Sequence, residues 1–172
     1  MPSRGTGQNC SSGRRCWSIP LRMELIDLIP NSMSFRIVTT VDIDDESEIP
    51  VGFTGRVRRS ADGVLAYVAW YQRGQLHNPG KMHPAYRRFR RDGRVKYDLF
   101  YTDGALQDPA TGEPAVRGYY ASGAVHYEER YSNGVRNNGA DGTSAVVKWR
   151  QDGTLRHEIQ YHAGHRVAPA GG

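Results

Sequence analysis

The sequence lacks any long apolar segment. No stretch approaches the roughly eighteen consecutive apolar residues of a membrane-spanning helix, and only 38% of the 172 residues are hydrophobic. The basic N-terminus is not followed by an apolar run either, which argues against a secretory signal. These absences predict a cytoplasmic protein.

Cysteine and lysine are also scarce. The 2 cysteines, Cys10 and Cys16, both lie in a leader rich in Gly, Ser and Arg, where a disulfide would stabilise no folded element. They have no Cys or His cluster nearby and make a poor zinc site, so we interpret them as free thiols in a reducing compartment. The formal net charge of +5 comes almost entirely from arginine. It indicates attraction to anions without identifying a partner.

Glycine and tyrosine, by contrast, are frequent, at 20 and 10 residues, and they recur at a fixed interval. A Tyr-x-x-Gly motif appears in steps of 30 residues, starting at Tyr71, Tyr101, Tyr131 and Tyr161. The same spacing holds for Gly63, Gly93, Gly123 and Gly153, for Leu65, Val95, Val125 and Leu155, and for Ala85, Ala115 and Ala145. This coincidence predicts a tandem repeat.

Each unit has the pattern of a β-hairpin followed by a second turn. Asp-Gly and Ser-Gly pairs supply the positive φ that hairpin turns need. A single hairpin is marginal in water, so the units must stack to bury their rings and branched side chains. We therefore predict an all-β fold, in which about four antiparallel hairpin units form an elongated, twisted meander sheet.

The turn length determines which side chains share a face. A three-residue loop at residues 91–93, with Gly93 left-handed, predicts one face that collects Phe89, Val95, Tyr97, Ala85, Leu99 and Tyr101. It places the basic residues Arg88, Arg90, Arg94 and Lys96 on the opposite, solvated face and leaves Arg87 among the rings.

Composition divides the chain into four parts. Residues 1–22 form a disordered basic leader, and residues 23–52 form a capping segment with one strand, at about 33–43. The repeat domain covers residues 53–166, and residues 167–172 form a flexible tail.

The segments "DGRVKYDLFYTDGAL", "SGAVHYEERYSNGVR" and "DGTLRHEIQYHAGHR" resemble MORN-like repeats, in particular the bacterial and viral variant associated with toxin–antitoxin antitoxins. The resemblance covers roughly residues 53–166. It implies an array of hairpins that acts as a scaffold or binding surface for proteins, with lipid head groups as a further ligand class. It implies no catalytic residues, and the period here is longer than that of the usual MORN repeat.

No pattern in the sequence indicates catalysis or a cofactor. A nucleophile with its base, a phosphate-binding Gly loop and a metal motif are all missing. The acidic segment at residues 42–48 lacks the Gly and terminal Glu of an EF-hand, so we interpret it as a solvated turn. His157, His162 and His165 do not share one strand face, so we predict no metal site there either.

We predict that the protein binds another protein without catalysing a reaction. The candidate contact residues are those that vary between otherwise similar units, Trp70, Phe100, Arg130 and Gln160, together with Tyr97 and Tyr127. The alternative for the tyrosines is a purely structural core. The alternative function is anion binding, to nucleic acid or acidic lipid, through Arg88, Arg90, Arg94 and Lys96. The open edges of such a sheet also allow self-association.

Overall fold

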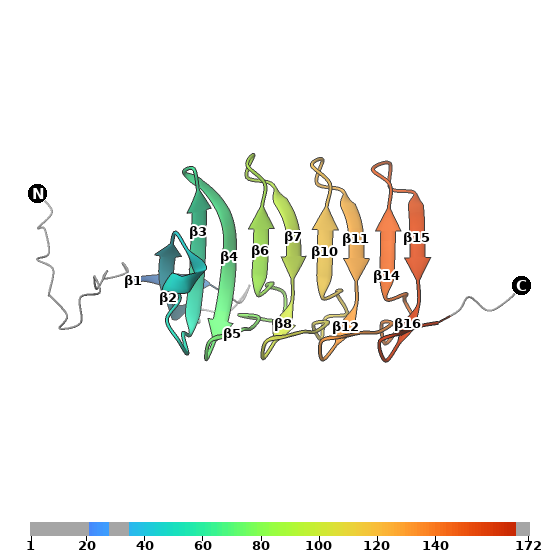
Figure 1. The fold of residues 1–172 in the computed structure, drawn as a ribbon, viewed down its shortest axis with the longest axis horizontal. Helices are drawn as coiled ribbons and strands as arrows, with labels where there is room; N and C mark the ends of the chain where they lie inside the picture. Colours follow the sequence, from blue (N-terminus) through green and yellow to red (C-terminus); the bar gives the residue numbers. More distant parts are fainter. Residues whose placement is uncertain (1–20, 28–34, 168–172) are drawn as a thin grey trace, which may run out of the picture.

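The computed structural model describes residues 21–27 and 35–167, and this part of the chain is all-β (Figure 1). One large sheet contains ten strands in chain order, and a short strand, β5 (Gln75–Leu76), pairs with β4 beside them. The ten are β1 (Leu21–Asp27), β2 (Phe35–Ile43), β3 (Gly55–Ala61), β4 (Val64–Gln72), β6 (Tyr86–Phe89), β7 (Val95–Leu99), β10 (Val116–Tyr119), β11 (Val125–Glu129), β14 (Val146–Trp149) and β15 (Leu155–Ile159). No helix within the described residues is long and apolar enough to cross a membrane.

The sheet is mixed, which corrects the prediction of a purely antiparallel meander. β2 and β3 pair in parallel, with Val41 opposite Val57, whereas the other pairs are antiparallel. Residues 44–54 carry the chain back to the start of β3 and include the 3-10 helix η1 (Glu46–Glu48). Neighbouring parallel strands need such a return segment, because a tight turn can only reverse the chain.

The N-terminal segment contains two strands where one was predicted. β2 lies within the predicted range, but β1 was missed, although Leu21, Met23 and Leu25 alternate with polar residues. The predicted leader, apart from residues 21 and 22, and the tail beyond residue 167 lie outside the described residues, as do Cys10 and Cys16.

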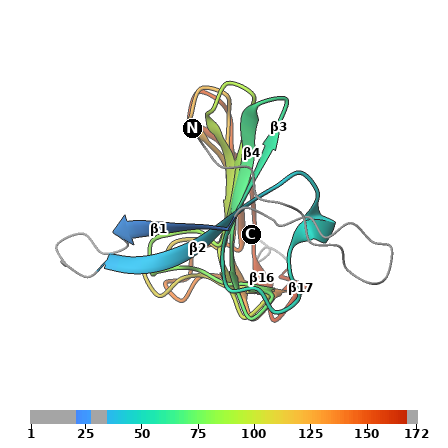
Figure 2. The same cartoon turned by 90° about the vertical axis from the view of Figure 1, so that its left-hand side faces the viewer.

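Short two-stranded ribbons extend from the lower ends of the hairpins. They are β8 (Tyr101–Thr102) with β9 (Ala105–Leu106), β12 (Tyr131–Ser132) with β13 (Val135–Arg136), and β16 (Tyr161–His162) with β17 (His165–Arg166). Both turn residues of the first ribbon have positive φ, 47° at Asp103 and 79° at Gly104. Seen from the N-terminal end, β3 and β4 rise above the level of the ribbons (Figure 2).

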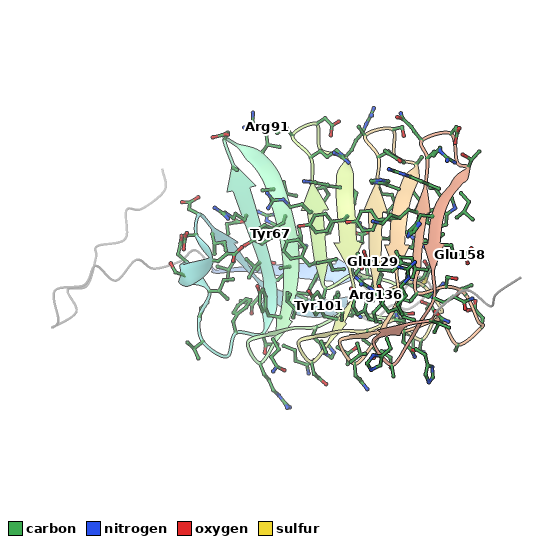
Figure 3. All side chains as sticks on the ribbon, turned by 45° about the vertical axis from the view of Figure 1, so that its right-hand side comes forward. Tyr67, Arg91, Tyr101, Glu129, Arg136 and Glu158 are labelled. Atoms are coloured by element: carbon green, nitrogen blue, oxygen red, sulfur yellow. The ribbon has the colours of Figure 1, made fainter. Side chains whose placement is uncertain are left out.

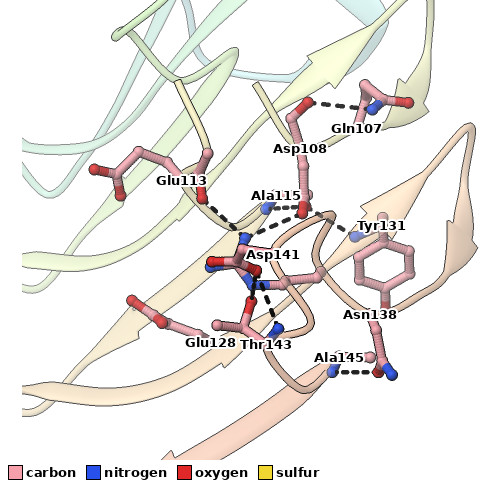
Figure 4. Close-up of polar contacts among 12 residues, drawn as sticks. Gln107, Asp108, Glu113, Ala115, Glu128, Tyr131, Asn138, Asp141, Thr143 and Ala145 are labelled. Atoms are coloured by element: carbon pink, nitrogen blue, oxygen red, sulfur yellow. Dashed lines mark hydrogen bonds and ion pairs between the residues drawn. The ribbon is translucent and has the colours of Figure 1, made fainter. Parts of the chain in front are cut away.

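A ladder of side-chain amides and carboxylates joins successive hairpins and ribbons. Oδ1 of Asn78 accepts hydrogen bonds from the backbone N–H groups of Ala85 and Tyr101, both at 3.0 Å. Asp108 makes the same pair of contacts with Ala115 and Tyr131 (Figure 4), and Asn138 makes them with Ala145 and Tyr161. In each case one side-chain oxygen accepts hydrogen bonds from two backbone N–H groups that have no carbonyl partner in the sheet.

Asp108 predicts a pH dependence of stability. Burial raises the pKa of this carboxyl above 3.8, although the N–H groups of Tyr131 and Ala115 oppose the shift. The folded chain then binds the proton more tightly than the unfolded chain, so the contribution of Asp108 to stability falls as pH rises through its folded pKa. Asp108→Asn removes this titration. We expect urea unfolding to show the variant gaining stability relative to wild type as the pH rises from 3.8, the ordinary pKa of the carboxyl, through its raised folded pKa. A difference that does not change with pH would rule out this effect.

The apolar core is concentrated at the N-terminal end of the sheet. Its buried members are Val41, Ile43, Phe53, Val57, Tyr67 and Ala69. Farther along the sheet, a fully buried alanine stands immediately before the first strand of each hairpin. These residues are Ala85, Ala115 and Ala145, each 0% exposed. Among the described residues, no second layer of strands lies against the upper part of the hairpins (Figure 2).

A β-bulge in each hairpin reverses the predicted distribution of faces. The three-residue loop is confirmed, because Arg90 N–H bonds to Arg94 O and Gly93 has φ 81°. The pairing then shifts, so that Phe89 lies opposite Val95 but Arg88 lies opposite Tyr97. The extra residue is Lys96. One extra residue moves every later side chain to the other face, so Tyr97 and Leu99 do not share a face with Phe89 and Val95.

Candidate functional site

The register gathers four hairpin tyrosines, Tyr67, Tyr86, Tyr97 and Tyr127, on one surface, which we call the tyrosine face. Its middle is a continuous row of directly opposed residues, the central row, which crosses seven neighbouring strands from β4 to β15. The row consists of Tyr67, Arg88, Tyr97, Gly118, Tyr127, Lys148 and His157. Tyr86 belongs to the next row of the same face. Rings and cations therefore alternate over much of this surface.

The rings of the tyrosine face pack mainly on one another. Tyr86 stacks between Tyr67 and Tyr97, with ring centroids 5.0 and 6.0 Å apart. The guanidinium of Arg88 lies 5.9 Å from the centre of the Tyr67 ring. Diagonal contacts of this kind stabilise neighbouring strands. The rings are thus held in place, with Tyr67 buried and Tyr86 and Tyr97 partly exposed.

At Gly118 the central row leaves no room for a side chain. A Cβ atom there would lie 2.1 Å from the ring of Tyr127, so the ring rests directly on the backbone of the neighbouring strand. Only glycine leaves that space without displacing the ring. Tyr127 and Tyr97 are both half-buried, and His157 at the end of the row is exposed.

The hydroxyl groups of Tyr86 and Tyr127 keep their protons at neutral pH. Burial raises the pKa of Tyr86 to about 12 and raises the pKa of Tyr127, which Glu129 raises further. Beside the row, Glu129 accepts from Arg136 at 2.6 Å and from the Tyr131 hydroxyl at 2.9 Å (Figure 3). The face therefore offers neutral donors together with cations, while this carboxylate is already paired.

On the opposite surface, which we call the ion-pair face, most charged side chains of the strands pair with one another. Arg58 pairs with Asp42 at 2.7 Å, Arg87 with Asp98 at 2.6 Å and Arg117 with Glu128 at 2.7 Å. Asp98 is only 5% exposed, and its hydrogen bond raises the pKa of Arg87. Arg87 lies on this face as a partner of Asp98, while Arg88 lies among the tyrosines.

The residues chosen for their variation do not form one exposed strip. Phe100 is 8% exposed, and the Arg130 side chain is 12% exposed and pairs with Asp108 at 3.3 Å. The segment that follows each short ribbon folds back over these two residues. The backbone N–H of Gln107 donates to Phe100 O, and the backbone N–H of Asn137 donates to Arg130 O. Gln160 is exposed. Trp70 lines a groove of about 500 Å³ with Val38, Gln72 and His77. Of the predicted contact residues, Tyr97 and Tyr127 belong to the central row.

The predicted anion-binding residues also separate. Arg90 donates to Tyr119 O and Arg94 to Ala121 O, each at 2.6 Å, so both hold the neighbouring hairpin loop. Lys96 is the exposed bulge residue, and only Arg88 belongs to the central row. The basic run is therefore in part a contact between hairpins.

The acidic segment is an ordered turn. Asp45 caps η1 by accepting from Ser47 N–H, and Glu48 accepts from Asp45 N–H, which forms a capping box. Glu46 lies at the end of the tyrosine face, where it accepts from the Tyr67 hydroxyl at 3.3 Å. No group of three or more His, Cys, Asp or Glu side chains arranged to hold a metal ion occurs within the described residues.

The sequence matches no family model, and no curated protein or solved structure is significantly similar to the chain.

Proposed function

We propose that this protein is a non-enzymatic interaction module that binds a protein partner along the central row of the tyrosine face. The observation that carries the proposal is the row itself, which crosses seven adjacent strands and sets the half-buried Tyr97 and Tyr127 beside the cations Arg88 and Lys148. Ordered rings give large contact area at a small entropic cost, as binding surfaces require. The cations Arg88 and Lys148 favour an extended, acidic segment of the partner.

A tandem array of MORN-like units over residues 53–166 is part of the same proposal. Support comes from the hairpins and from the polar ladder, in which Asn78, Asp108 and Asn138 make equivalent contacts. Scaffolding in the cytoplasm, including an antitoxin-like role in a bacterium or phage, is consistent with such a surface. No cofactor is needed for that role.

Nucleic acid or acidic lipid is the second candidate, favoured by Arg88 and Lys148 among the rings. Two observations make nucleic acid or lipid a weaker candidate than a protein partner. Single-stranded nucleic acid binds by stacking bases on free ring faces, whereas Tyr86 already stacks on Tyr67 and Tyr97. The guanidinium groups of Arg90 and Arg94 are engaged by carbonyls of the next loop.

A charge reversal in the row tests the proposal. Lys148→Glu places a carboxylate between Tyr127 and His157, and we expect it to reduce partner binding roughly tenfold, because it repels an acidic segment. The measurement is quantitative co-purification from a lysate of the native host, treated with nuclease. Lys96→Glu makes the same charge change at the exposed bulge position, outside the row, and should retain the partner.

Three outcomes contradict the proposal. A protein retained equally by wild type and Lys148→Glu does not bind the row. Equal loss in both variants indicates a general charge effect. Material that disappears with nuclease, or binding that falls steeply with salt to a nucleic acid probe, establishes the second candidate. Equal melting temperatures of the two variants are required as the control for folding.

A further inference from the structure

The last strand of the sheet, β15, has one open side. Within the described residues it pairs only with β14, and residues 151–158 are exposed, with Leu155 at 51%. Two internal junctions show what occupies the same position earlier in the sheet. Tyr97–Leu99 of β7 pair with the start of β10, and Tyr127–Glu129 of β11 pair with the start of β14. The corresponding residues of β15 are His157, Glu158 and Ile159.

The open side continues into the residue that follows the strand. At the internal junctions Phe100 N–H donates to Ala115 O at 2.7 Å, and Arg130 N–H donates to Ala145 O at 2.8 Å. Gln160 follows β15 as Phe100 follows β7, and no carbonyl of residues 35–167 accepts from its N–H. A further strand would therefore meet the same kind of backbone edge that β4, β7 and β11 present to the next hairpin.

Glu158 gives this edge a charge preference. On the ion-pair face Asp98 lies between Arg87 and Arg117 in the register. Glu158 instead lies opposite Val147, and it accepts from the Ser144 hydroxyl at 2.5 Å. None of the described residues supplies a cation to it, and Figure 3 shows it on the outermost strand. The vacant position beside Glu158 thus matches a basic residue.

We propose that the β15 edge is a second interaction site, separate from the central row, which accepts one antiparallel strand of a partner protein. The strand carries Arg or Lys opposite Glu158 and an apolar residue opposite Ile159, as Val116 and Val146 lie opposite Leu99 and Glu129. Main-chain hydrogen bonds supply affinity, and the basic residue supplies selection. A second copy of this chain fits less well, because β15 pairing with itself in this register sets Glu158 against Glu158.

The chain supplies its own probe for this site. Residues 114–119, with the sequence PAVRGY, hold the equivalent position against β7, where Arg117 lies opposite Asp98. We expect the capped peptide, titrated into the ¹⁵N-labelled full-length chain, to shift the amide resonances of residues 157–160 and few others. The same peptide with Arg117→Glu should bind roughly tenfold more weakly.

A charge swap decides between a specific edge and adventitious contact. Glu158→Lys, at an exposed position, should reject the wild-type peptide and bind the Arg117→Glu peptide. No shift at residues 157–160 with millimolar peptide, or equal binding of both peptides by both proteins, overturns the proposal. Sedimentation of the free chain tests the remaining occupant. A dimer that perturbs the same amides would assign the edge to self-pairing and would also overturn the proposal, whatever the outcome for Lys148→Glu in the central row.

Discussion

Asn78→Ala is expected to destabilise the protein by about 3 kcal/mol, because an unpaired buried donor costs about 1–3 kcal/mol and this change leaves two. The Asn78 side chain accepts from the N–H groups of Ala85 and Tyr101. Ala85 is 0% exposed, so water cannot replace the lost acceptor there. For a domain of this size the loss lowers the melting temperature by roughly 6–12 °C.

The matched control for this variant keeps the acceptor atom. Asn78→Asp retains Oδ1, and Asp108 makes the same two contacts with a carboxylate. We expect Asn78→Asp to lose much less stability than Asn78→Ala in thermal unfolding. If both variants melt together, the amide oxygen does not join the hairpin to its ribbon, and the ladder is not a source of stability.

Gly104→Val is expected to cost roughly 2 kcal/mol or more, because a β-branched residue strongly resists positive φ. Gly104 has φ 79° in the two-residue turn between β8 and β9. Its N–H also bonds to Leu76 O at 2.9 Å, which ties the ribbon to the preceding unit. Distortion of this turn therefore weakens the turn and the contact with its neighbour together.

Arg94→Ala is the comparison for the turn. Arg94 is exposed, and its guanidinium donates to Ala121 O. Loss of one exposed hydrogen bond should cost about 1 kcal/mol or less. Chemical denaturation should rank Gly104→Val well below Arg94→Ala in stability. Equal midpoints for the two variants would contradict the assignment of the Tyr-x-x-Gly segment as a tight turn.

The turns and the all-β class could be predicted from the sequence, because both depend on local chemistry. Positive φ at Gly93 and Gly104 follows from the need of a hairpin turn for a residue without Cβ. The polar ladder was missed, although its signal was present, since Asn78, Asp108 and Asn138 are polar residues with equal spacing. Their role depends on two backbone donors far away in sequence, so turn patterns alone did not reveal it.

The composition of each face could not be predicted from the local pattern. Nothing in the segment around Lys96 marks it as the bulged residue, yet the bulge exchanges the faces of Arg87 and Arg88 relative to the rings. The central row depends entirely on that exchange. The parallel pairing of β2 and β3 was likewise hidden, because the direction of a strand follows from the path of residues 44–54 and not from its own sequence.

The proton resonances of Gly118 test the central claim, that the bulged hairpins pair in register and place Tyr67, Tyr86, Tyr97 and Tyr127 on one face. The ring of Tyr127 lies where a Cβ of Gly118 would be. We therefore expect a strongly upfield-shifted Gly118 Hα, nuclear Overhauser contacts from it to the Tyr127 ring, and loss of the shift in Tyr127→Leu. A Gly118 Hα near its random-coil position, with no contact to that ring, would contradict the register and the tyrosine face built on it.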